Sequence, residues 1–158
     1  MIKSVEELRV EYQNSVSQAD KALGFWERLK KYRGSEGVVL AYQASALALK
    51  ARHDWNPYNK LAWLNECMNI FKAAVKADPD NIEIRFLRFA IQHYTPEFLK
   101  HNQNLDRDKT VFLNNVHKFR EFDLEVSHVT SFLGFFEESK RFKKEELQII
   151  QNIIQHNP

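Results

Sequence analysis

The sequence is poor in residues that bend or cross-link a chain, with 4 Gly, 4 Pro and 1 Cys among 158 residues. Tight hairpin turns depend on glycine, and no long stretch alternates apolar and polar residues, so a protein built mainly of β-strands is disfavoured. The single cysteine, Cys67, cannot form an internal disulfide. Its register on the apolar face of an expected helix indicates a buried, inert thiol rather than a nucleophile.

Long apolar runs are also missing. No run approaches the roughly 20 residues that a membrane-spanning helix needs, so membrane insertion is not expected. The first residues, MIKSVEELRVEY, are too charged for a signal peptide. Cytoplasm is therefore the default location, although a chain from which an exporting segment had been removed would have the same composition.

Neither sign of charge dominates, since 23 Lys and Arg stand against 21 Asp and Glu. A nucleic-acid-binding protein draws its affinity from a concentrated basic face, so no nucleic-acid partner is expected. The runs RLKKYR (28–33) and KRFKK (140–144) are the only local candidates for such a face. We interpret both as solvated helix ends, because cations are favoured at helix C-termini.

Apolar residues are plentiful, at 44% of the chain with 12 Phe among them. This content is enough for a buried core and predicts one domain over residues 1–158. The scarcity of Gly and Pro and the lack of alternating segments predict that this domain is all-α. Apolar positions recur at helical spacing between turn signals such as RGSEG (33–37) and DWNPYN (54–59). Expected helices start at Ser4, resume around Leu23–Leu29, and then cover about 37–53, 58–77, 82–94, 106–120, 124–138 and 143–156.

The segment FKAAVKADPDN (71–81) resembles the second helix and terminal proline of a tetratricopeptide repeat, with Phe71, Ala74 and Pro79 at that family's spacing and Asn81 after the turn. The chain departs from the family pattern elsewhere. Cys67 stands where the family has a small alanine, and Arg85 and Phe89 stand where its Trp and Gly usually lie. Helix pairs are expected to begin near 37, 81 and 124, which is about 44 residues apart rather than 34.

This resemblance implies stacked antiparallel helical hairpins, as an α-α superhelix or an irregular helical bundle. Such stacks commonly receive peptides or proteins on a concave surface. A non-enzymatic protein- or peptide-interaction module is therefore the function that the resemblance implies. The oligomeric state is left open.

A polar strip interrupts the helix that follows this turn. Arg85, Arg88 and Gln92 are spaced by three and four residues and so lie on one line between two apolar stripes. One interpretation is a structural ion pair with a neighbouring carboxylate such as Glu66 or Glu97. The other is a groove lining that engages an anionic group or a peptide C-terminus, because arginine presents a planar fork to carboxylates and phosphates.

Catalytic and metal-binding patterns are scarce. The six histidines show no His-Glu-x-x-His spacing, and neither a glycine-rich phosphate loop nor a Gly-x-Ser-x-Gly elbow occurs. No cofactor is expected. A small helical enzyme or ligand-binding protein with a site near Arg85 and Arg88 remains the alternative, and nucleic-acid binding is a weaker one. An open groove with exposed aromatics such as Trp55 and Tyr58 favours a protein partner, whereas a closed pocket with histidines and carboxylates favours chemistry.

Overall fold

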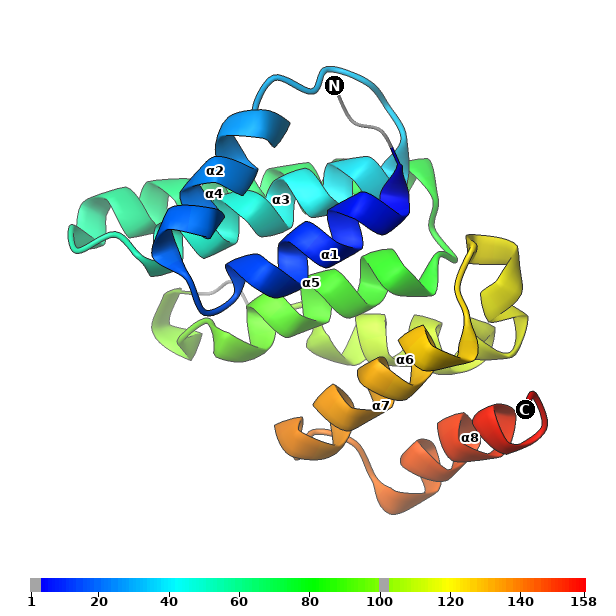
Figure 1. The fold of residues 1–158 in the computed structure, drawn as a ribbon. Coiled ribbons are helices and arrows are strands. Elements are labelled where there is room, and N and C mark those ends of the chain that lie inside the picture. Colours follow the sequence, from blue (N-terminus) through cyan, green and yellow to red (C-terminus); the bar gives the residue numbers. More distant parts are fainter. Residues whose placement is uncertain (1–3, 100–102) are drawn as a thin grey trace. The chain divides into compact units, whose positions relative to one another are not determined.

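The structure is a computed structural model that describes residues 4–99 and 103–158. Within these ranges the chain forms eight α-helices and two short 3-10 helices and no β-strand (Figure 1). The prediction of an all-α protein is therefore confirmed. Two compact units can be separated, an N-terminal unit made of the residues up to Pro79 with Thr95–Leu99, and a C-terminal unit made of Asp80–Tyr94 with residues 103–158. The expectation of a single domain stays a prediction.

In the N-terminal unit the first, third and fourth helices begin within about one residue of the predicted positions, whereas the second begins at Ala19, earlier than predicted. The Ser4 hydroxyl accepts a hydrogen bond from the backbone N–H of Glu7 at 3.2 Å and caps the first helix. Pro57 opens the longest helix, where its missing N–H is not needed. The elements of this unit are α1 (Val5–Ser15), α2 (Ala19–Leu29), α3 (Gly37–Arg52), α4 (Pro57–Ala77) and the 3-10 helix η1 (Glu97–Leu99).

The core of this unit lies between α3 and α4, which make the most extensive contact in it. Buried alanines of α3, among them Ala44, let the two helices approach closely. The Sγ–H of Cys67 on α4 donates to the Ala44 carbonyl at 3.2 Å, and Phe71, one turn further on, is completely buried. The prediction that Cys67 is buried is confirmed.

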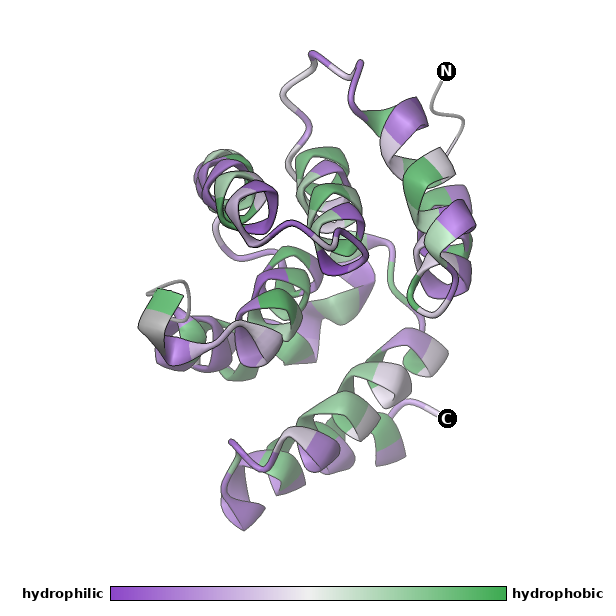
Figure 2. Cartoon of the chain, turned by 90° about the vertical axis from the view of Figure 1, so that its left-hand side faces the viewer, coloured by the Kyte–Doolittle hydropathy of each residue, from purple (hydrophilic) through white to green (hydrophobic). Residues whose placement is uncertain are grey.

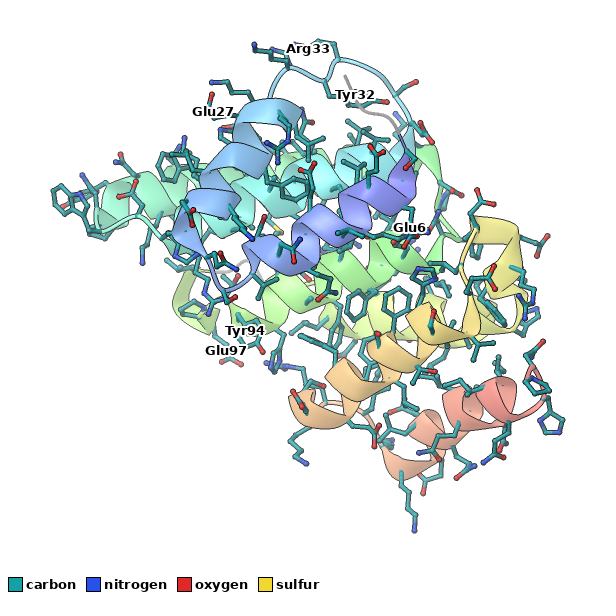
Figure 3. The ribbon with its side chains drawn as sticks, in the orientation of Figure 1. Glu6, Glu27, Tyr32, Arg33, Tyr94 and Glu97 are labelled. Carbon is teal, nitrogen blue, oxygen red and sulfur yellow. The ribbon has the colours of Figure 1, made fainter. Side chains whose placement is uncertain are left out.

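The loop between α2 and α3 is held by side chains from both of its ends. The buried Gln43 amide donates to the carbonyls of Leu29 and Tyr32 at 2.9 and 3.2 Å. The Tyr32 hydroxyl accepts from the Glu36 N–H at 3.1 Å, and its side chain lies so close to Gly34 that a Cβ there would collide with the hydroxyl oxygen. Figure 3 labels Tyr32 and its neighbour Arg33 in this loop. Glycine at position 34 thus makes room for the tyrosine ring.

The C-terminal unit is built around a cluster of phenylalanines. Phe86 stacks on Phe132 with ring centroids 4.3 Å apart, and Phe136 contacts Phe112 edge-on at 4.8 Å. Aromatic pairs at these separations stabilise a core beyond the area that they bury. The elements of this unit are α5 (Ile82–Tyr94), α6 (Leu105–Asn115), the 3-10 helix η2 (Val116–Phe122), α7 (Val126–Ser139) and α8 (Lys144–Gln155).

One expected helix is shorter than predicted. The α-helix expected over 106–120 ends at Asn115, and the chain continues as η2, within which Lys118 has non-helical dihedral angles. Val116 and Phe119 are both buried. A 3-10 helix has three residues per turn, so it directs side chains three residues apart to the same side. Asp123, in the left-handed conformation, then ends the segment.

Candidate functional site

The two arginines in the polar strip of α5 meet the buried carboxylate of Asp108. Arg88 donates two hydrogen bonds to Asp108, from Nε to Oδ2 at 2.8 Å and from Nη2 to Oδ1 at 2.7 Å. Nη1 of Arg85 donates to the same Oδ1 at 3.0 Å. Arg85 is 4% exposed, Arg88 6% and Asp108 1%. We call these three residues the Asp108 cluster, and all of it belongs to the C-terminal unit.

Local sequence signals position both sides of the cluster. The Asn81 side-chain oxygen accepts from the N–H groups of Glu83 and Ile84 at 2.9 and 3.3 Å, which fixes the first turn of α5. The two arginines then follow three residues apart on one side of the helix. Asp108 lies in the first turn of α6, where the helix dipole favours a carboxylate.

Neither of the carboxylates expected from the sequence, Glu66 or Glu97, is the partner of the two arginines in the structure. Glu66 and Glu97 are both exposed, whereas Asp108 accepts from both guanidinium groups. The reason is that Asp108 is 20 residues or more away along the chain and reaches α5 only after α6 has packed against it. Buried charges with this many mutual hydrogen bonds favour the structural interpretation over the groove lining. Gln92, one turn beyond, is likewise buried.

Trp55 and Tyr58 lie elsewhere. Trp55 is in the turn between α3 and α4, and Tyr58 is in the first turn of α4. Trp55 is 89% exposed and Tyr58 83%, and Leu61, three residues further on, is also exposed. Spacings of three place Tyr58 and Leu61 on one side of α4. Figure 2 views the chain from the side of this turn, which is drawn in the hydrophilic colour between the two helices. We call Trp55, Tyr58 and Leu61 the aromatic tip.

The backbone of this turn is ordered by its own side chains. The N–H of Asn56 donates to Oδ1 of Asp54 at 2.7 Å, and the N–H of Tyr58 donates to Oδ1 of Asn56 at 2.9 Å. The aromatic rings take no part in these bonds. The other two tryptophans contrast with Trp55. Trp26 and Trp63 are half-buried, and the Lys50 ammonium lies 5.9 and 4.3 Å from the centroids of their rings.

The five residues predicted as a site therefore form two separate groups. Arg85, Arg88 and Gln92 lie in the C-terminal unit, and Trp55 and Tyr58 lie in the N-terminal unit. Sequence reasoning missed Asp108 as the partner of the arginines, although its register in an acidic first helical turn was visible. It also gave no sign that the Arg141 guanidinium contacts His93, whose Nδ1 accepts from Arg141 Nε at 2.9 Å.

Burial shifts the pKa of two groups whose chemistry could otherwise be nucleophilic or basic, Cys67 and His93. Burial raises the pKa of the Cys67 thiol well above its usual range, and the negative charge of Glu66 adds to this effect, so thiolate does not form near neutral pH. Burial lowers the pKa of the His93 imidazole, as does the positive charge of Arg141. Within residues 4–99 and 103–158, no three His, Cys, Asp or Glu side chains gather where they could hold a metal ion.

Comparison with known proteins gives no match to a protein-family model, to a curated protein or to a solved structure. The resemblance to tetratricopeptide repeats thus stays a prediction. None of the helices in the described ranges combines the length and the apolar character that crossing a membrane requires.

Proposed function

We propose that this protein is a non-enzymatic interaction module that binds a protein or peptide through the aromatic tip. The observation that carries the proposal is the exposure of Trp55 and Tyr58, at 89% and 83%. Trp and Tyr are enriched among the few residues that supply most of the binding energy at protein interfaces. Each presents a large apolar surface together with a hydrogen-bonding group.

The support beneath the tip favours binding as well. Cys67 and Phe71 anchor α4 against α3, and the bonds of Asp54 and Asn56 order the turn before any partner arrives. A binding surface that is already ordered loses less conformational entropy on association. A stack of tetratricopeptide-like hairpins, as the FKAAVKADPDN segment implies, would present such a tip at one end of a hairpin.

A site at the Asp108 cluster has less support. A substrate or an anionic partner would have to displace Asp108 from two guanidinium groups that are 4% and 6% exposed. Breaking such a buried arrangement costs several kcal/mol. We therefore assign Arg85 and Arg88 to the stability of the fold rather than to binding, and we propose no catalytic function.

The experiment that tests the proposal places a photo-crosslinking phenylalanine derivative at position 58 and, as a control, at the exposed position 148 on α8. Illumination in a lysate of the source cells should give one defined adduct from position 58 and none of the same mass from position 148. An excess of unlabelled wild-type chain should suppress this adduct, while the unlabelled Trp55→Ala chain should not. Equal suppression by both chains would contradict a role for the aromatic tip.

A further inference from the structure

Positive charge gathers on the helical hairpin that carries the aromatic tip. Residues 37–77 contain five Lys or Arg and two Asp or Glu, a net charge of +3, whereas the whole chain carries only +2. No acidic residue occurs within α3 itself. The hairpin is therefore the basic part of a molecule whose remaining residues are on balance slightly acidic.

Two of these cations flank the aromatic tip along the chain. Arg52 is the last residue of α3 and donates from Nη1 to the Val16 carbonyl at 3.3 Å, and Lys60 lies in the first turns of α4, two residues from Tyr58. The nearby carboxylate, Asp54, is occupied, since it accepts from the Asn56 N–H at 2.7 Å and from the Asn59 amide at 3.5 Å. The exposed aromatic residues thus stand between two basic residues in the sequence of this turn.

We infer that the occupant of the aromatic tip is an acidic protein segment. Its apolar side chains would pack on Trp55 and Tyr58, and its carboxylates would lie beside Arg52 and Lys60. This inference rests on the proposed function and adds the chemistry of the partner. Complementary charge at the rim of an interface steers the encounter and selects among partners more than it adds affinity.

The same surface fits other anionic partners less well. Binding to a membrane surface depends on a broad apolar face, and three exposed apolar residues bury little area in lipid. Nucleic-acid binding draws on the release of several counterions, which needs more phosphate contacts than two cations can make. An acidic peptide needs only one or two carboxylates placed beside Arg52 and Lys60.

The test is a selection of random 12-residue displayed peptides on the wild-type chain, with counter-selection on the Trp55→Ala chain. The retained peptides should be enriched in Asp and Glu relative to the library. Lys60→Glu should weaken their binding by about tenfold at 50 mM salt, and the loss should shrink as salt is raised. Lys72→Glu is the matched control, because position 72 lies about 18 Å further along α4, beyond the screening length of roughly 14 Å at 50 mM salt.

Each result separates the inference from the proposed function. Trp55-dependent peptides that are neutral or basic would overturn the acidic partner and leave the aromatic tip as a docking surface. If no Trp55-dependent peptide emerges, both proposals fail. Trp55-dependent binding to vesicles of phosphatidylcholine and phosphatidylserine, or to a thymidine oligonucleotide, with no acidic peptide selected, would overturn the inference in favour of lipid or nucleic acid. Circular dichroism melts of each variant establish that it is folded.

Discussion

Asp108 accepts three hydrogen bonds from two arginines that lie one helical turn apart on α5. Placing these charges out of water is costly, and the cost is repaid only while the carboxylate is present. The cluster therefore need not make the protein more stable than an apolar core would. It makes α5 and α6 depend on one another, because both arginines stay charged and would be buried without a counter-charge if α6 moved away.

The Asp108→Asn variant tests this dependence, because it keeps the shape of the side chain and removes its charge. We expect the free energy of unfolding, measured by urea denaturation, to fall by about 3 to 5 kcal/mol. Asp106→Asn is the control, since Asp106 lies in the same helical turn and is exposed, and its effect should stay within about 0.5 kcal/mol. Similar losses in the two variants would contradict the structural role.

His93 predicts a dependence of stability on pH. Its pKa in the folded chain lies below the value of about 6.5 for an unfolded chain, so the unfolded state takes up the proton first as the pH falls. The free energy of unfolding should therefore decrease as the pH falls below about 6.5. His93→Gln keeps an acceptor for Arg141 without titrating, and urea denaturation between pH 5.5 and 7.5 should show a shallower dependence for this variant. Identical slopes would rule out this contribution.

Among the elements, α4 joins the two features that matter most for the proposed function. Its buried side holds Phe71 against the core, and its first turns carry Tyr58 and Leu61 of the exposed aromatic tip. The helix can present Tyr58 to a partner because packing further along fixes its position. Stability and binding are thus assigned to different turns of one helix.

Phe71→Ala should lower the free energy of unfolding by about 3 to 5 kcal/mol, because it removes a completely buried aromatic ring and leaves a cavity. Tyr58→Ala in the same helix is the control and should change it by no more than about 0.5 kcal/mol. Chemical denaturation followed by far-UV circular dichroism measures both. A loss below about 1 kcal/mol for Phe71→Ala would mean that the ring does not belong to the core.

Local signals explain why most helix boundaries could be predicted. The cap at Ser4, Pro57 at the start of α4 and the turn before Asn81 act within a few residues of the boundary that they set. The end of α6 at Asn115 could not be predicted in this way, since apolar residues continue in register past it. After Asn115, the burial of Val116 and Phe119 in the C-terminal unit favours a 3-10 helix over a continued α-helix.

The site was predictable only in part, for a related reason. The alignment of Arg85, Arg88 and Gln92 on one helix follows from spacing alone, but the choice of Asp108 over Glu66 or Glu97 depends on contacts between residues far apart in the chain. The exposure of Trp55 follows from its place in a turn before proline. Its separation from the arginines into another unit has no signal in the sequence.

At the scale of the whole molecule, the Asp108 cluster and the residues proposed to bind lie in different units. The Asp108 cluster and the phenylalanine core belong to the C-terminal unit, and the aromatic tip belongs to the N-terminal unit. The net charge is also unevenly distributed, since the α3–α4 hairpin of the N-terminal unit carries +3 and the whole chain carries +2. Stability and binding should therefore respond to different substitutions.

The most direct test compares thermal melting and partner capture for two variants, Trp55→Ala/Tyr58→Ala and Arg88→Ala. We predict that the double variant melts within about 2 °C of wild type and no longer captures the partner that the photo-crosslinking experiment identifies. Arg88→Ala should melt about 6 to 12 °C lower, because the buried Asp108 carboxylate loses the two hydrogen bonds that Arg88 donates. Normal melting of Arg88→Ala with loss of the partner, or retained capture by the double variant, would contradict the assignment of binding to the aromatic tip.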